Sequence, residues 1–192
     1  MKVLGISGSN RKDGNTAFLV KKILEHVDEE ECSEIETEFV SLAGKTIKPC
    51  TGCELCKEKK TCVIQNDDWG DIAERILDCD VLILGSPTYY YDVCGHLKNF
   101  MDRTYSFYHD RKLAGRSAIV VSVCADRGCE RTLETLEAFV NTHEFSYLGF
   151  VGGRGYLPGD ILRDQRALAK CKEVAGKIIK LLRKNSEYIK SL

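Results

Sequence analysis

The chain has 192 residues, of which 43% are hydrophobic and 30% are charged, and its formal net charge is -1 at pH 7. A chain of this length can bury one good hydrophobic core and is short for two, so we expect a single domain over residues 1–192. Because charges of both signs are interspersed and nearly cancel, the composition argues against a surface built for nucleic acid or for an anionic membrane. No apolar run reaches the roughly 18 residues of a membrane-spanning helix and no signal-peptide layout opens the chain, so we expect a cytoplasmic protein.

The first predicted elements are a strand, a polar loop and a helix. The strand covers Lys2–Ile6, and the helix after the loop has an apolar face that includes Leu19 and Ile23. In such a layout, hydroxyls of the loop and free N–H groups at the helix start can converge on one phosphate. The alternative is an ordinary turn in which Asn15 or Thr16 caps the helix.

The composition of this loop indicates which phosphate it suits. It lacks G-x-x-x-x-G-K-[ST], which grips a nucleoside triphosphate, and it lacks G-x-G-x-x-G, which binds a dinucleotide. A loop rich in hydroxyls with one arginine suits a terminal phosphomonoester. The candidate binding residues are Ser7, Gly8, Ser9, Arg11, Asn15 and Thr16.

A second strand is predicted at Glu34–Ser41, where apolar or small residues alternate with glutamates. A strand with so many carboxylates cannot lie in the middle of a parallel sheet that is covered on both faces. We therefore expect it at an edge, as in the strand order 2-1-3-4-5.

Four cysteines follow in the spacing C-x2-C-x2-C-x5-C, within a loop that covers residues 48–63. The four candidate metal ligands are Cys50, Cys53, Cys56 and Cys62. Three thiols inside seven residues let a tight loop wrap one side of an inorganic core, and the fourth closes it, which predicts one [4Fe–4S] cluster. Structural zinc is the alternative, although it usually takes two separated C-x2-C pairs, and a metal-free redox or disulfide role is a further one.

After the cysteines, Asp67 and Asp68 are expected to cap a helix at Trp69–Leu77, and Asp80–Gly85 is predicted to be a central strand. The loop that follows this strand carries a tyrosine run at the edge where doubly wound sheets bind ligands. Tyrosines there offer flat walls to a planar ring, although packing under the loop is the alternative. The candidate ring-binding residues are Ser86, Pro87, Thr88, Tyr89, Tyr90 and Gly95.

The remaining elements repeat the alternation of helix and strand. A helix is predicted to run through Leu97 to about Tyr108, with Asp102 and Arg103 as a structural ion pair. Strands are predicted at Ser117–Cys124 and Tyr147–Val151, with a helix between them. The other predicted features are a flexible exit at Gly152–Gly155, a cap at Asp164 on a long terminal helix, and Cys129, which packs or is reactive at a helix start. Cys32, Cys79, Cys94, Cys124 and Cys171 are expected to be small apolar residues near the core.

This alternation predicts an α/β sandwich of three layers around a five-stranded parallel sheet. The chain resembles the iron–sulfur flavoproteins, within the flavodoxin-like NAD(P)H-dependent FMN reductases. The resemblance rests on Gly5–Ser9 with Arg11 and Gly14–Thr16, on the cysteine run that leads to Asp67 and Asp68, and on Gly85–Tyr90 with Gly95, Leu97, Lys98, Asp102 and Arg103. It covers most of the first 105 residues, and residues 125–129 depart from the family pattern.

The resemblance implies an FMN whose phosphate lies at the first loop and whose ring lies at Pro87–Tyr90, together with a [4Fe–4S] cluster. It further implies a homodimer or tetramer, with dioxygen or peroxide among the possible small acceptors. Because a cluster passes one electron at a time and a flavin takes one or two, we expect the protein to take electrons from a one-electron donor such as ferredoxin and to pass them to that acceptor. An NAD(P)H-dependent flavin or quinone reductase, and a non-enzymatic electron carrier or redox sensor, are the alternatives. No residue stands out as a catalytic acid or base.

The cysteine run is surrounded by lysines, which are candidates for docking a donor protein. Lys45, Lys48, Lys57, Lys59 and Lys60 outnumber Glu54 and Glu58, so the loop is expected to form a positive patch that could steer an acidic ferredoxin. Simple solvation of the loop is the alternative.

Overall fold

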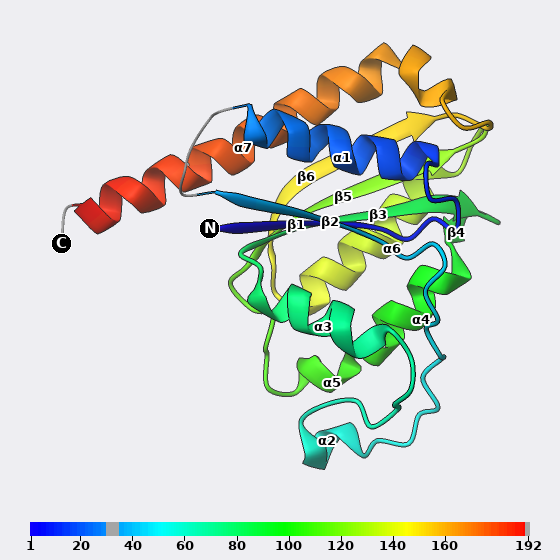
Figure 1. Cartoon of the computed structure of the whole chain (residues 1–192), viewed down its shortest axis with the longest axis vertical. Helices are drawn as coiled ribbons and strands as arrows, with labels where there is room; N and C mark the ends of the chain where they lie inside the picture. The colour runs from blue at the N-terminus through cyan, green and yellow to red at the C-terminus, as the bar shows by residue number, and fades with distance from the viewer. Residues whose placement is uncertain (30–34, 191–192) are drawn as a thin grey trace.

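The computed structural model describes residues 1–29 and 35–190. A parallel sheet lies at its centre, with helices on both faces (Figure 1). The elements are β1 (Lys2–Ser7), α1 (Asn15–Asp28), β2 (Glu36–Ser41), α2 (Cys56–Lys59), α3 (Trp69–Asp78), β3 (Val81–Tyr89), β4 (Asp92–Val93), α4 (Gly95–Arg103), α5 (Tyr105–Tyr108), β5 (Ser117–Cys124), α6 (Cys129–Thr142), β6 (Ser146–Arg154), the 3-10 helix η1 (Asp160–Arg163) and α7 (Gln165–Lys190). In the described part of the chain, no helix combines the length and the apolar character that crossing a bilayer requires.

The five long strands pair in parallel in the order β2-β1-β3-β5-β6. This order confirms the predicted 2-1-3-4-5 arrangement, with the glutamate-bearing β2 at an edge. The charge on β2 is accommodated there because Glu38 forms an ion pair with Arg75 of α3. Glu34 and Cys32 lie outside the described residues.

Side chains of the sheet alternate between two hydrophobic layers. Val3 and Ile83 pack with α1 and α7, whereas Leu4 and Leu84 pack with α3, α4 and α6 on the opposite face (Figure 1). Because β3 and β5 are covered on both faces, their sequences are apolar almost throughout, as expected of central parallel strands. Cys79, Cys94, Cys124 and Cys171 are buried, which confirms their prediction as core residues.

The third strand is longer than predicted and forms a hairpin that sequence reasoning missed. Instead of a loop after Gly85, β3 continues to Tyr89 and pairs antiparallel with β4. The two turn residues, Tyr90 and Tyr91, have φ values of 49° and 66°. Two positive φ values in a two-residue loop are typical of a type I′ turn, which usually contains Asn-Gly, so a Tyr-Tyr pair gave no hairpin signal.

Two other segments differ from their predictions. The predicted helix through Leu97 to Tyr108 is divided at Thr104 into α4 and α5. The predicted flexible exit at Gly152–Gly155 is largely strand, since β6 runs to Arg154. Gly153 packs closely against η1, because a Cβ there would lie 2.5 Å from Cδ1 of Ile161 and that side chain would have to move. The cap at Asp164 is confirmed: its Oδ1 accepts the N–H of Ala167 at 3.0 Å in the first turn of α7.

Candidate functional site

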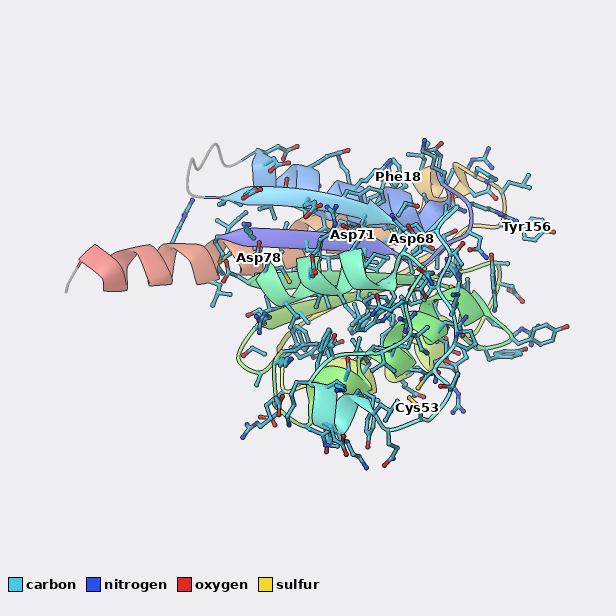
Figure 2. All side chains as sticks on the ribbon, turned by 60° about the horizontal axis from the view of Figure 1, so that its bottom comes forward. Phe18, Cys53, Asp68, Asp71, Asp78 and Tyr156 are labelled. Carbon is cyan, nitrogen blue, oxygen red and sulfur yellow. The ribbon has the colours of Figure 1, made fainter. Side chains whose placement is uncertain are left out.

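The cysteine run forms an extended loop between β2 and α3, with α2 at its tip in the lower part of Figure 1. Three of its residues have positive φ: Gly52 at 64°, Glu54 at 59° and Lys60 at 59°. The backbone therefore turns sharply at three points of this loop. Figure 2 shows Cys53 on this loop, well below α3, with Asp68 just before the helix and Asp71 and Asp78 along it.

The four cysteines come together as predicted. They line one cavity of about 50 Å³, whose wall also contains Arg103 and Tyr105. Among residues 1–29 and 35–190, no three His, Cys, Asp or Glu side chains converge closely enough to hold one metal ion. Four cysteine thiols around one cavity are the ligand set that a [4Fe–4S] cluster requires.

Two of the sulfurs already accept hydrogen bonds of the kind that iron–sulfur ligands receive. The N–H of Gly52 donates to Cys50 Sγ at 3.4 Å, and Nε of Arg103 donates to Cys62 Sγ at 3.3 Å. Burial raises the pKa of Cys56, and its three neighbouring cysteines raise it further, so the four sulfurs are close enough to interact electrostatically. The donor set and its surroundings fit an iron–sulfur cluster.

Arg103 connects this loop to the core through a network that the sequence did not reveal. Its side chain is fully buried and forms an ion pair with Asp67, which is 2% exposed. It also donates to the carbonyl oxygens of Ile64 at 2.8 Å and Lys48 at 3.4 Å, and its guanidinium lies 4.7 Å from the ring centroid of Trp69. One side chain therefore holds both ends of the cysteine loop.

This network overturns two predictions. Arg103 pairs with Asp67 and not with Asp102, which pairs with Lys98 one turn earlier in α4. The predicted capping pair is replaced by a single residue, because only Asp67 accepts an N–H from the first turn of α3, that of Trp69. Asp68 stands at the N-cap position of α3 without a side-chain capping bond, and its carboxylate accepts the N–H of Thr46 at 2.7 Å. Burial would raise the pKa of Asp67, but hydrogen bonds from Arg103 and from the N–H of Lys48 outweigh it and lower that pKa.

The predicted positive patch is largely neutralised. Lys57 pairs with Glu54, Lys60 with Asp110 and Lys45 with Asp68, while Lys48 donates to the carbonyl of Gln65. Only Lys59 among the five has no such partner in the described residues. Steering of a donor by these lysines therefore has less support than their number suggested.

At the other candidate site, the start of α1 is open to an anion. Gly14 is the N-cap residue and no side chain caps the helix, whose first turn contains no acidic residue. Ser7, Ser9 and Thr16 are all buried around this helix start. Ser7 Oγ is fully buried without a hydrogen-bond partner in the described part of the chain. An uncapped helix start beside an unpaired hydroxyl fits a phosphate.

Other residues of the predicted phosphate loop hold the backbone in place. Asn15 donates to the carbonyl of Leu157 at 2.9 Å and accepts the N–H of Gly159 at 3.0 Å, while Arg11 donates to the carbonyl of Tyr156 at 2.9 Å. These bonds fasten the loop after β6 to the start of α1. Gly8 lets the loop approach α4 closely, because a Cβ at this position would lie 2.7 Å from Cβ of Leu97. Figure 2 shows Tyr156 projecting outward from this end of the molecule.

The predicted ring-binding segment lies at the carboxyl end of β3 and combines internal and exposed groups. Ser86 Oγ accepts the N–H of Cys94 at 3.0 Å, and Thr88 Oγ1 bonds Ser122 and Thr132, both at 2.9 Å. Those hydroxyls stabilise the hairpin. Tyr89 and Tyr90 are 46% and 101% exposed, so their rings remain available to a planar ligand. Pro87 is half-buried beside them, and Gly95 begins α4 with open space around it.

The loop at residues 125–129 belongs to the same region. Gly128 has a φ of 94°, and a Cβ there would lie 2.7 Å from Cδ1 of Tyr91. The loop therefore packs directly against the tyrosine hairpin. The sequence left the contacts of this loop open, because residues 125–129 depart from the family pattern.

Comparisons with known proteins agree with this geometry. Residues 1–150 match the family model of NADPH-dependent FMN reductases. An iron–sulfur flavoprotein of Methanocaldococcus jannaschii is 37% identical over 199 aligned residues, which cover 96% of this chain and 100% of the relative.

Solved structures share the fold. The Trp repressor binding protein from Bacillus subtilis superposes with a TM-score of 0.68 and 26% identity, over 90% of this chain and 96% of that one. A flavodoxin from the domain Archaea superposes with a TM-score of 0.60 and 13% identity, over 95% and 99% of the two chains. The latter likeness concerns the fold, which is the flavodoxin-like arrangement predicted from the sequence.

Proposed function

Because this chain belongs to the NADPH-dependent FMN reductase family and, within it, to the iron–sulfur flavoproteins, we propose that it carries electrons from a one-electron donor through a [4Fe–4S] cluster to FMN. The protein is an FMN-dependent oxidoreductase. The observation that carries the proposed route is the cavity enclosed by four thiols, two of which accept hydrogen bonds. A bound cluster supplies one-electron transfer and a bound flavin supplies one- or two-electron transfer.

In this proposal each group of residues has a defined task. Cys50, Cys53, Cys56 and Cys62 bind the cluster, while Arg103 orients Cys62. The open start of α1, with the hydroxyls of Ser7, Ser9 and Thr16, binds the FMN phosphate. The hairpin at Pro87–Tyr90 binds the ring, with Ser86 and Gly95 at its base.

The donor, the acceptor and the assembly extend the proposal. A ferredoxin would deliver single electrons to the exposed cysteine loop, and dioxygen or peroxide would take them from the flavin. We propose a homodimer or tetramer in the cytoplasm as the working form. A second candidate function is direct reduction of the flavin by NAD(P)H, which the description of the matching family favours.

The experiment that separates these routes is anaerobic stopped-flow reduction of the loaded protein. We expect reduced ferredoxin to bleach the flavin faster than NADPH does at equal concentration. Because most lysines of the loop are paired, the ferredoxin rate should depend only weakly on salt. Faster reduction by NADPH would replace the proposed donor with the second candidate. Reversible reduction without turnover of any acceptor would contradict the proposed route to an acceptor.

The FMN phosphate site can be tested by removing one hydroxyl. Thr16→Val keeps the shape of the buried side chain but deletes its Oγ1, so we expect weaker binding of FMN. A hydrogen bond to a charged group contributes about 1.5–3 kcal/mol, which corresponds to a rise in Kd of roughly ten- to hundredfold. Ser41→Ala, which removes a hydroxyl bonded to the N–H of Ala43 at the end of β2, is the matched control. Equal flavin affinities in fluorescence titrations of both variants would rule out the assignment of Thr16.

A further inference from the structure

A cavity of about 790 Å³ is lined by none of the candidate cofactor-binding residues. It lies beside the edge strand β6, between the start of α6 and the segment from η1 to α7. Its wall combines two thiols, Cys124 and Cys129, with an excess of cationic side chains. Neither the proposed flavin site nor the cluster site accounts for two thiols and several cationic side chains around one cavity.

The two thiols face one another across a short loop. Cys124 ends β5 and Cys129 begins α6, and both Sγ atoms point toward the carbonyl oxygen of Gly153, at 3.8 Å and 3.1 Å. Cys124 is 3% exposed, whereas Cys129 is only partly buried. Burial and the contact with Cys129 raise the pKa of Cys124 to about 12. Cys129 is therefore the sulfur that a molecule in the cavity reaches first, with Cys124 behind it.

The charged side chains of the wall favour an anion. Asp126 pairs with Arg127, Asp160 accepts two backbone N–H groups, and Lys170 pairs with Glu173. In contrast, the guanidinium groups of three arginines have no hydrogen bond or ion pair with any described residue. These arginines are Arg154, Arg163 and Arg166. Of the wall's carboxylates, Asp160 and Asp164 accept backbone N–H groups and Glu130 has no partner among the described residues. Across the whole wall, five cationic side chains face four carboxylates, a small positive excess.

We propose that Cys124 and Cys129 are a redox-active dithiol that exchanges with a small anionic disulfide bound in this cavity. The thiolate of Cys129 attacks one sulfur of the ligand, which forms a mixed disulfide and releases the first ligand thiol. Cys124 Sγ then attacks Cys129 Sγ, which forms the Cys124–Cys129 disulfide and releases the second ligand thiol. The protein loses two electrons and two protons, and the ligand disulfide gains both. Excess ligand thiol reverses the reaction.

The exchange can be followed in the intact, cofactor-loaded protein under anaerobic conditions with oxidised glutathione, whose carboxylates make it an anionic disulfide. After remaining thiols are alkylated, trypsin cuts after Arg116, Arg127 and Arg131. The two cysteines then lie on separate peptides, residues 117–127 and 128–131. We expect these peptides to be recovered as one disulfide-linked species, which disappears after reduced glutathione is added in excess. Recovery of both peptides only in the alkylated form would overturn the proposal.

Substitution of each thiol tests the order of attack. Cys124→Ala should trap Cys129 as a mixed disulfide with glutathione, whereas Cys129→Ser should leave Cys124 free for alkylation after unfolding. Circular dichroism identifies a variant that has lost its fold. If a variant unfolds, the peptide map of the wild-type protein still tests whether the Cys124–Cys129 disulfide forms. A mixed disulfide on Cys124 in the Cys129→Ser variant would contradict the assigned order.

The arginines are tested by the charge of the oxidant. Arg154→Gln combined with Arg163→Gln should slow exchange with oxidised glutathione by about tenfold, because electrostatic attraction of the ligand is lost. The same variant should react with hydroxyethyl disulfide, which is uncharged, at the wild-type rate. Equal slowing with both oxidants, or with neither, would show that the cavity does not select an anion.

Discussion

Replacing Cys53 by serine is expected to yield a protein that retains FMN but loses its iron–sulfur cluster. Thiolate ligands hold each iron of such a cluster, and a serine oxygen is a poor substitute for a soft metal. Because Cys53 lies on the exposed loop, away from the core, the fold should persist. Iron and acid-labile sulfide per chain should fall to background, with loss of the broad absorption near roughly 400 nm that is expected of a cubane cluster. Flavin content should be unchanged.

The matched control for this variant is Cys171→Ala, which removes a thiol from the buried interface between α1 and α7. Cys171 Sγ makes only a long contact, 3.8 Å, with the carbonyl of Leu19. Its loss should lower stability modestly and leave the iron content intact. If Cys53→Ser retained a full complement of iron and sulfide, the four-cysteine assignment would have to be abandoned. A wild-type protein that contains one zinc ion per chain and no iron would contradict the cluster assignment equally.

Arg103→Met is expected to produce the largest loss of stability among single substitutions in the cluster region. It removes the partner of the buried Asp67 carboxylate and leaves the carbonyls of Ile64 and Lys48 without a donor. Breaking a buried pair from one side costs about 3–5 kcal/mol. The measurement is the free energy of unfolding from urea titrations at neutral pH, with FMN and cluster contents recorded for each sample.

Arg75→Met is the control, because Arg75 also pairs with carboxylates, those of Glu38 and Asp71, but on the surface. An exposed pair contributes about 0–1 kcal/mol, so this variant should remain close to wild type. Adding Asp67→Asn to Arg103→Met should recover part of the lost stability, since no uncompensated charge then stays buried. Equal losses for Arg75→Met and Arg103→Met would refute the special role of the buried pair.

A second measurement separates support of the loop from tuning of the cluster. Hydrogen bonds to ligand sulfurs and nearby positive charge both stabilise the reduced, more negative form of a cluster. Where Arg103→Met still assembles the cluster, its midpoint potential should therefore fall below that of the wild type. An unchanged potential would mean that Arg103 only supports the loop.

Several features were predictable because they depend on local or periodic signals. The apolar strands, the glutamates of β2 and the spacing of the four cysteines indicate the sheet order and a cluster loop without tertiary information. Each of these signals is confined to one segment. A strand buried on one face alternates apolar and polar residues, and a strand buried on both faces is apolar throughout, so its burial can be read from its own residues. The roles of individual side chains at the flavin site stay predictions, since nothing but hydroxyl content and position supports them.

The sequence by itself therefore determined the layers, the strand order and the candidate cluster ligands. Only the tertiary structure decided that Arg103 pairs with Asp67 and supports Cys62, that Tyr90 and Tyr91 form a hairpin turn, and that Cys124 and Cys129 share one cavity. The physical reason is distance along the chain. Arg103 and Asp67 are separated by 36 positions along the chain. Which charged groups pair over that distance depends on how whole helices and loops pack together, and the residues next to each group do not indicate it.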